Sequence, residues 1–443
     1  MDLAVIGIMF VILILGNIPI GFIFGVVGLY ALRMAGFESV VAVRQIYSGI
    51  DSFNLLALPF FIFAGEIMSR GGIIQKLLDI SDALVGKLRG SLGHTNVVAS
   101  MLFAGISGTA QSDAGALGSM LIPAMQERGY SRGYSSAITA ASSMCGPIIP
   151  PSSPLIIYGG IMDISIAGLF AAGMLPGITL GIILMVINYF IVVKRGYEPI
   201  EKFQRTEKVT LKVISIGIFK YFKNFFVSLK KGFTAVILFL IIFGGILGGI
   251  FTATEAAGIA ATYAIILVLF VLRTINYREL WDVFKSVNSM IGITLVIVGT
   301  GRILSHYLAI QRVPQMIAEY LLQVTTTDWV FLLICAVFLL FVGTFMDLAA
   351  SIIILGPVLT PVASQFGIQP FHFGIFFIFT LNVALITPPV GVILFVVSAV
   401  GKIEIEELVR EIVPFYVAFI AVILLIAFFE PITTFMPKLL GFL

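Results

Sequence analysis

The chain has 443 residues, of which 59% are hydrophobic and 11% are charged, against roughly 45–50% and about 25% in soluble domains. Apolar runs recur from end to end, and about 20 such residues suffice for a helix that crosses a bilayer, so this composition excludes a soluble globular protein. The net charge is +3, and the two cysteines and three scattered histidines give neither a disulfide framework nor the ligand spacing of a transition-metal site.

Seven apolar stretches are the clearest candidates for membrane-spanning helices. They are residues 1–31, 164–193, 233–251, 256–272, 291–308, 329–345 and 413–429. A shorter stretch, 55–68, favours one arm of a re-entrant hairpin, and the chain as a whole predicts roughly ten to twelve membrane-embedded elements. The first stretch lacks the basic region of a signal peptide. We expect it to be retained as the first helix of an all-α, multi-pass membrane protein.

A basic segment separates the two halves of the chain. Residues 194–231 contain ten Lys or Arg and three Glu, a local net charge of +7, which places the segment in the cytoplasm by the positive-inside rule. Its aromatic residues and lysines recur at near-helical spacing, which is typical of a helix lying along anionic headgroups. A basic loop that only orients the protein is the alternative, and nucleic-acid binding is disfavoured.

Two proline-rich stretches interrupt the apolar pattern and resemble each other. They are CGPIIPPSSP (145–154) and LITPPVG (385–391), and their Pro-Pro pairs lie 238 residues apart (388 minus 150). The same offset aligns Pro123 with Pro361 and Gly129 with Gly367, and a Gly-Thr…Asp stretch precedes each break. We therefore expect an internal duplication. Secondary transporters commonly use inverted repeats whose broken helices meet at the midplane, and we expect that arrangement here, although sequence matching leaves the orientation open.

A Pro-Pro pair inside a membrane helix leaves backbone carbonyls without donors. In hydrocarbon such carbonyls cost several kcal/mol each unless they are buried in protein or line a polar cavity. The two breaks are therefore predicted to form oxygen-only cages for a hard cation, one on each side of a single substrate site. The Gly-rich stretches near them allow close backbone approach. A pair of helix kinks without function is the alternative.

Charged side chains inside apolar segments are costly and mark candidate functional residues. Asp113 and Asp347 follow the two Gly-Thr stretches, where each could hold a cation, support its ligands or cap a half-helix. Arg302 lies deep in an apolar segment and could bind a substrate carboxylate through two parallel hydrogen bonds. A structural ion pair of Arg302 with Glu66, Asp347 or another buried acid is the alternative. Glu66 and Glu255 favour helix-terminal or interhelix partners over substrate ligands.

Six motifs follow one another in a recognisable order. They are LALPFFIFAGEIMSRGGI, SGTAQSDAGALGSMLIPAM, GPIIPPS, GGIFTATEAAGIAATYA, FMDLAASIIILGPVLTP and LITPPVG, between residues 55 and 395. As a set they resemble the large membrane subunit (DctM-type) of tripartite ATP-independent periplasmic (TRAP) transporters. The resemblance implies an elevator-type member of the ion transporter superfamily, with helical hairpins and broken helices, in the bacterial inner membrane. It implies sodium-driven uptake of a small organic acid without ATP, and no GxxxxGK[ST] motif occurs.

The same resemblance implies two partners. One is a small four-helix membrane subunit, which we expect to be a separate chain because no four-helix block precedes the first motif. The other is a soluble periplasmic solute-binding protein. Sodium ions are the expected coupling ions, and no other cofactor is expected.

The resemblance also implies two sodium sites. The first would use Ser107, Gly146, Ile149 and Pro151, mainly through backbone carbonyls, and the second Gly343, Thr344, Ala384 and Thr387. The offset of 238 independently places Gly146, Ile149 and Pro151 over Ala384, Thr387 and Pro389. Ser152 and Pro389, beside the breaks, join Arg302 as predicted substrate-binding residues.

The chain departs from the family pattern at three points. Ala384 has no side-chain oxygen, so only its carbonyl can serve as a ligand. Glu66 stands where the family often has a neutral Asn, and the basic segment between the halves is long.

We expect five segments along the chain. An N-terminal scaffold helix and connector cover 1–50, and a first repeat with a transport-domain hairpin and a broken helix covers 51–193. The basic cytoplasmic or interfacial segment covers 194–232, a second such repeat covers 233–412, and a C-terminal scaffold helix covers 413–443.

Two functions remain open on this evidence. One is a TRAP translocation subunit for a carboxylate-bearing solute such as a C4-dicarboxylate, a sialic acid or a sugar acid. The other is a stand-alone sodium- or proton-coupled carboxylate symporter that needs no binding protein. No nucleophile–base set supports an enzyme, and the repeated broken helices argue against an open channel filter.

Overall fold

The computed structural model describes residues 2–16, 18–197 and 232–443, and in these ranges every regular element is helical. In the first half the helices are α1 (Asp2–Leu15), α2 (Ile20–Met34), α3 (Ser39–Ile50), η1 (Phe53–Leu56), α4 (Ala57–Arg70), α5 (Ile73–Val85), α6 (Ser91–Ser107), α7 (Ala110–Glu127), α8 (Arg132–Ser143), α9 (Ser153–Met162) and α10 (Ile166–Arg195). In the second half they are α12 (Phe233–Leu247), α13 (Ala253–Ile266), η2 (Leu267–Val271), α14 (Tyr277–Ile310), α15 (Val313–Val324), α16 (Asp328–Gly343), α17 (Leu348–Gln365), α18 (Pro370–Ala384), α19 (Val392–Gly401), α20 (Ile405–Phe428) and α21 (Pro431–Leu439). The interfacial helix predicted in the basic segment falls on residues 198–231, outside the described residues.

The helices of the second half repeat those of the first at the predicted offset. Adding 238 to the bounds of α7 gives 348–365, the bounds of α17, and α8 and α18 begin at 132 and 370. The starts of α9 and α19 differ by 239 (392 minus 153), as do those of α10 and α20 (405 minus 166). The predicted internal duplication is therefore confirmed at the level of whole helices, while the inverted orientation stays a prediction.

Six helices in the described part of the chain are long and apolar enough to cross a membrane. They are Phe53–Arg70, Ile166–Arg195, Ala253–Val271, Tyr277–Ile310, Leu348–Gln365 and Ile405–Phe428. A further candidate is the pair α15 and α16, bent by 119°. Stretch 55–68, predicted as a hairpin arm, lies inside an 18-residue helix long enough to span by itself.

Helix ends in the terminal segments differ from the sequence prediction. The prediction of one helix over 1–31 is wrong: α1 ends at Leu15 and α2 begins at Ile20, directly after Pro19, because proline cannot continue a helix from the preceding turn. The C-terminal segment 413–443 contains the end of α20 and all of α21, which starts at Pro431.

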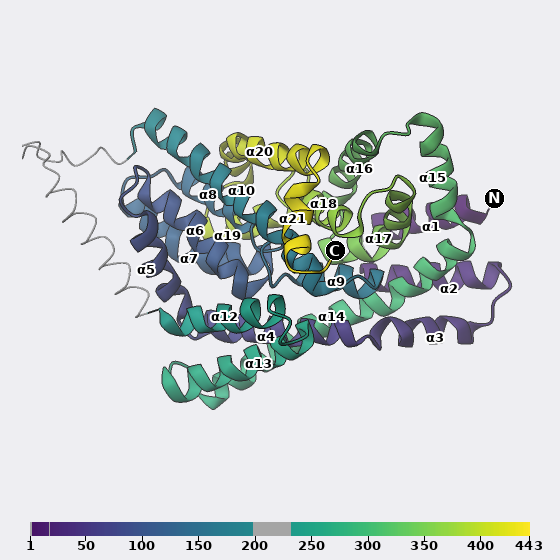
Figure 1. The fold of residues 1–443 in the computed structure, drawn as a ribbon, viewed down its shortest axis with the longest axis horizontal. Helices are drawn as coiled ribbons and strands as arrows, with labels where there is room; N and C mark the ends of the chain where they lie inside the picture. Colours follow the sequence, from purple (N-terminus) through teal and green to yellow (C-terminus); the bar gives the residue numbers. More distant parts are fainter. Residues whose placement is uncertain (1, 17, 198–231) are drawn as a thin grey trace, which may run out of the picture.

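Each repeat contains a helical hairpin followed by a broken helix. In the first repeat α6 and α7 form the hairpin and α8 and α9 the broken helix; in the second they are α16 with α17 and α18 with α19. The repeats interlock, because α9 packs against α17 of the other hairpin and α19 packs against α7. In Figure 1 the helices α6–α8 lie to the left of α16–α18, and α9 lies beside α17.

One hydrogen bond joins the two breaks at equivalent positions. The side-chain amide of Asn382 donates to the carbonyl of Met144 at 2.8 Å, and the two residues are 238 apart. Both residues are buried. Met144 lies two residues before Gly146, and Asn382 lies two residues before Ala384. The two predicted cation sites therefore flank a single central contact.

Long arm helices border this core. Helix α14 packs along α2 and α3, and its counterpart α4 packs along α13. In Figure 1 the arms α3, α14, α4 and α13 run along one long edge of the molecule. The arms reach the core where α14 contacts α17 and α4 contacts α6, so the hairpins meet the arms across an extended boundary.

Candidate cation and substrate sites

The first break leaves three backbone carbonyls without partners in the ranges that the structure describes. Among the described residues, no hydrogen-bond donor reaches the carbonyl oxygens of Gly146, Ile149 and Pro151. The break is nevertheless buried, because glycines on α10 let it approach closely. A Cβ on Gly173 would lie 2.5 Å from the Ile148 carbonyl oxygen. Buried carbonyls without donors are unusual in proteins, and these three are available to a cation.

The tip of the first hairpin touches this break. Gly108, between α6 and α7, has a φ of +62° and accepts a hydrogen bond from the backbone N–H of Ser153 at 3.2 Å. A Cβ on Gly108 would lie 2.5 Å from the Pro151 carbonyl oxygen, so both the left-handed backbone and the close approach require glycine. This contact brings Ser107 at the hairpin tip next to Pro151 in the break.

Asp113 lies between the hairpin tip and the break. It is fully buried, and the Ser107 hydroxyl donates to its Oδ1. Its Oδ2 has no hydrogen-bond partner among the described residues, and a Cβ on Gly146 would lie 2.7 Å from that oxygen. A buried carboxylate is costly without compensating charge. Asp113 is not the cap of α7, a position held by Thr109, and it sits among the predicted ligands of the first sodium site.

The second break repeats this pattern with different side chains. The carbonyl oxygens of Gly343, Thr344 and Thr387 have no donor among the described residues, whereas that of Ala384 accepts the backbone N–H of Thr387 at 3.0 Å. A Cβ on Gly343 would lie 2.7 Å from the Ala384 Cβ, so here too the hairpin tip adjoins the break. The structure thus brings the four predicted ligands of the second site to one tip-and-break contact.

The two threonine hydroxyls of the second site donate their hydrogens to backbone carbonyls of their own helices. Thr344 Oγ1 donates to the carbonyl of Phe341 at 2.8 Å, and Thr387 Oγ1 donates to that of Val383 at 2.9 Å. A hydroxyl with its hydrogen engaged keeps two lone pairs. Both hydroxyls can therefore still serve as oxygen ligands.

Asp347 does not occupy in the second repeat the position that Asp113 occupies in the first. It is exposed, and its Oδ2 accepts the backbone N–H of Ala349 at 2.9 Å as the N-cap of α17. The capping alternative therefore holds for Asp347. The offset of 238 pairs Asp347 with Thr109, the cap of α7, and pairs Asp113 with Ser351. The aspartates of the two Gly-Thr…Asp motifs thus occupy positions one helical turn apart in the two repeats.

The other two acids have partners on or beside their own helices. Glu66 pairs with Arg70 one turn further along α4, with 2.7 Å between Arg70 Nε and Glu66 Oε1. Glu255 forms a capping box with Thr252 at the start of α13.

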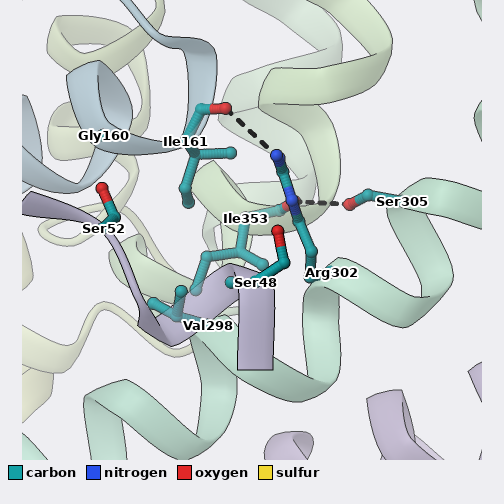
Figure 2. A pocket seen from close by; sticks show the side chains of 9 residues that line it. Ser48, Ser52, Gly160, Ile161, Val298, Arg302, Ser305 and Ile353 are labelled. Carbon is teal, nitrogen blue, oxygen red and sulfur yellow. Dashed lines mark hydrogen bonds between the residues drawn. The ribbon is translucent and has the colours of Figure 1, made fainter. Parts of the chain in front are cut away.

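Arg302 lines a small cavity between the arms and the core. Figure 2 shows its guanidinium pointing at the carbonyl of Ile161, the acceptor of a 3.4 Å hydrogen bond from Nη1. Ile161 lies in the last turn of α9, where carbonyls lack helix partners and a cation is favourable. No acid of the described residues lies within ion-pair distance of Arg302, so the structure does not contain the predicted alternative pair with Glu66 or Asp347.

The cavity mixes hydroxyls with this one charge. Its lining comes from α3 and the residues just after it, α9, α14 and α17, and consists of Ser48, Gly49, Ser52, Gly160, Ile161, Val298, Arg302, Ser305 and Ile353. Its volume of about 30 Å³ has room for ordered water but not for a molecule the size of an organic acid. An organic acid would therefore fit only if α9 and α17 moved away from α3 and α14.

The other two predicted substrate residues lie elsewhere. Ser152 caps α9, and its hydroxyl donates to the carbonyl of Pro147 within the first break. Pro389 is exposed at the second break. The structure therefore does not join Ser152 and Pro389 to the cavity of Arg302. Sequence reasoning missed Ser351 and Asn382, although the offset of 238 already relates them to Asp113 and Met144.

Comparisons with known proteins agree on the family. The family described as "Tripartite ATP-independent periplasmic transporter, DctM component" matches residues 6–432. The sialic acid TRAP transporter large permease protein of Vibrio cholerae is 39% identical over 429 residues, 96% of each chain. The C4-dicarboxylate TRAP transporter large permease protein of Pseudomonas aeruginosa is 32% identical, over 90% of this chain and 89% of its own.

A solved structure supports the fold. The YdaH transporter of Alcanivorax borkumensis superposes with a TM-score of 0.61 at 15% identity, covering 91% of this chain and 90% of its own. With the family match over nearly the whole chain, the predicted family is confirmed. The chain belongs to the DctM family, the large permease subunits of tripartite ATP-independent periplasmic transporters.

Proposed function

We propose that this subunit carries a carboxylate-bearing organic solute into the cell, driven by an inward sodium gradient. The observation that carries the proposal is the pair of tip-and-break contacts. No donor among the described residues satisfies the carbonyls of Gly146, Ile149 and Pro151 at the first, or those of Gly343, Thr344 and Thr387 at the second. Related permeases are named for sialic acid and for C4-dicarboxylates. These names support solutes that carry carboxylates.

Sodium fits the chemistry of the two breaks. Backbone carbonyls and hydroxyls are the ligands that hard cations prefer, and transporters coordinate sodium with unwound backbone at midplane breaks. At the first break Asp113 Oδ2 is a buried oxygen without a hydrogen-bond partner among the described residues, and a cation would satisfy it. Two bound sodium ions would offset the charge of a carboxylate and lower the cost of carrying it through a low-dielectric interior.

We assign the substrate carboxylate to Arg302. Its single hydrogen bond to the Ile161 carbonyl leaves guanidinium donors for two parallel bonds to a carboxylate. The small cavity lies between arms and hairpin core. Loading it therefore requires the core to move relative to the arms, as in an elevator mechanism.

Membership of the TRAP family implies association with other TRAP components. We propose that these are a small four-helix membrane subunit and a periplasmic solute-binding protein, in the bacterial inner membrane. The alternative function is a stand-alone symporter, because the breaks and sodium sites would have the same structure in a TRAP subunit and in such a symporter.

The first prediction distinguishes the TRAP subunit from the stand-alone symporter. Proteoliposomes containing this chain and its small membrane partner should take up labelled sialic acid or a C4-dicarboxylate only with an inward sodium gradient and the binding protein together. Sodium-driven uptake without the binding protein would establish the stand-alone symporter. Uptake that is equal in sodium and in potassium would overturn sodium coupling.

The second prediction compares the two aspartates. Asp113→Asn removes a charge among the proposed ligands, so the sodium concentration for half-maximal uptake should rise on the order of tenfold. Asp347→Asn should change it far less, because Asn caps helices as well as Asp does. Equal sodium dependence of both variants and the parent would contradict our assignment of Asp113.

The third prediction concerns Arg302. Arg302→Gln should reduce uptake of acidic solutes on the order of tenfold or more, because a hydrogen-bonded charge contributes about 1.5–3 kcal/mol. Arg302→Lys should recover part of the uptake, since it keeps the charge but loses the two-pronged geometry. Arg33→Gln, at an exposed arginine in the last turn of α2, is the control. Full uptake by Arg302→Gln would leave Arg302 as a structural residue that caps α9.

A further inference from the structure

We propose that the hydroxyl of Ser351 is a ligand of the second sodium site, which makes that site free of carboxylates while the first contains Asp113. The inference rests on the sodium coupling proposed above. It adds a residue that neither the motifs nor the family resemblance assigns, and a difference in charge between two otherwise repeated sites.

Ser351 occupies the place in the second repeat that Asp113 occupies in the first. Thr109 caps α7 and Asp113 follows it by four residues; Asp347 caps α17 and Ser351 follows it by four. Because α7 and α17 have the same bounds after the offset of 238, both residues lie one turn into the second helix of their hairpin.

This place lies between a hairpin tip and a helix break. In the first repeat Asp113 contacts Ser107 at the tip and abuts Gly146 in the break. In the second repeat the tip and break adjoin directly at Gly343 and Ala384. The repeat relation therefore puts Ser351 beside the predicted ligands of the second site.

The hydroxyl of Ser351 has no hydrogen-bond partner in the part of the chain that the structure describes. The residue is fully buried, and no group of the described residues hydrogen-bonds its Oγ. Buried helical serines usually bond the carbonyl one turn back, as Ser81 does to Leu77 at 2.8 Å. At Ser351 that carbonyl, of Asp347, accepts only the backbone N–H of Ser351, at 2.9 Å. A buried hydroxyl without a bond is costly, and a cation would satisfy its lone pairs.

The two sites then differ in charge. The first would be neutral once sodium binds beside the carboxylate of Asp113. The second has only carbonyls and hydroxyls, because Asp347 is exposed and caps α17. Sodium bound there keeps its positive charge in a low-dielectric surrounding, which complements an anionic solute.

The test measures sodium binding rather than transport. The purified complex of this chain with its small membrane partner is heated at increasing NaCl, with KCl holding ionic strength constant, and a ligand that binds the native state raises the unfolding temperature. Two sodium sites should give two phases in the rise of the unfolding temperature with NaCl. In Ser351→Ala the sodium concentration at half-saturation of one of these phases should rise on the order of tenfold. Ser351→Cys, nearly the same size, should behave alike because sulfur is a poor ligand for hard cations.

Two further variants complete the design. Ser351→Asp copies the first site and should lower the half-saturating sodium. Ser136→Ala is the matched control: Ser136 is also fully buried with an unpartnered hydroxyl, but it lies on α8 against Gly401. It should titrate like the parent.

The outcomes separate this inference from the proposed function. Parent protein that sodium does not stabilise beyond potassium would contradict sodium coupling itself. Stabilised parent protein with Ser351→Ala and Ser351→Cys both titrating like Ser136→Ala would overturn the role of Ser351 alone.

Discussion

Backbone carbonyls that lose their helix partners inside a membrane protein are the constraint on which this structure depends. Each Pro-Pro break releases carbonyls that hydrocarbon cannot solvate. The fold buries the first break against a hairpin tip and the glycines of α10, whereas the second break adjoins its hairpin tip with its Pro-Pro pair exposed. The carbonyls of Gly146, Ile149 and Pro151 at the first break, and that of Thr387 at the second, still lack a donor among the described residues. Carbonyl oxygens that lack a donor in this way are free to bind a cation.

Interlocking of the repeats makes the two breaks one unit. Each broken helix packs its second half on the hairpin of the other repeat, and Asn382 bonds the carbonyl of Met144 across the centre. A displacement of either hairpin therefore carries both proposed sodium sites with it. Arg302 stands outside this unit, on the arm helix α14, and reaches it only through the carbonyl of Ile161. This contact, like the packing of α14 on α17, lies where an elevator movement would have to separate core from arms.

The sequence predicted those features that covalent chemistry determines locally. Proline cannot donate a hydrogen bond in any context, so the offset between the Pro-Pro pairs predicted the duplication, the breaks and their carbonyls. Apolar content, by contrast, does not specify where helices end, and the apolar run 1–31 predicts one helix where the structure has α1 and α2. Similarity of motif also gave a wrong pairing. Asp347 resembles Asp113 in its motif, but its position at the start of α17 makes it the N-cap.

Contacts between distant segments were beyond prediction from local pattern. The neighbour of Arg302 is a carbonyl on α9, 141 residues away, and no periodicity relates the two. Ser351 and Asn382 are ordinary residues by composition. Only their burial, their unpartnered oxygens and the repeat relation single them out.

The central claim is that two sodium ions, bound at the paired breaks, enter the cell with each solute molecule. Its most direct test is the simultaneous entry of radioactive sodium and labelled organic acid into proteoliposomes holding the complete transporter. The account predicts that solute addition triggers sodium entry at two or more ions per solute molecule. Solute accumulation with no accompanying sodium entry would contradict it.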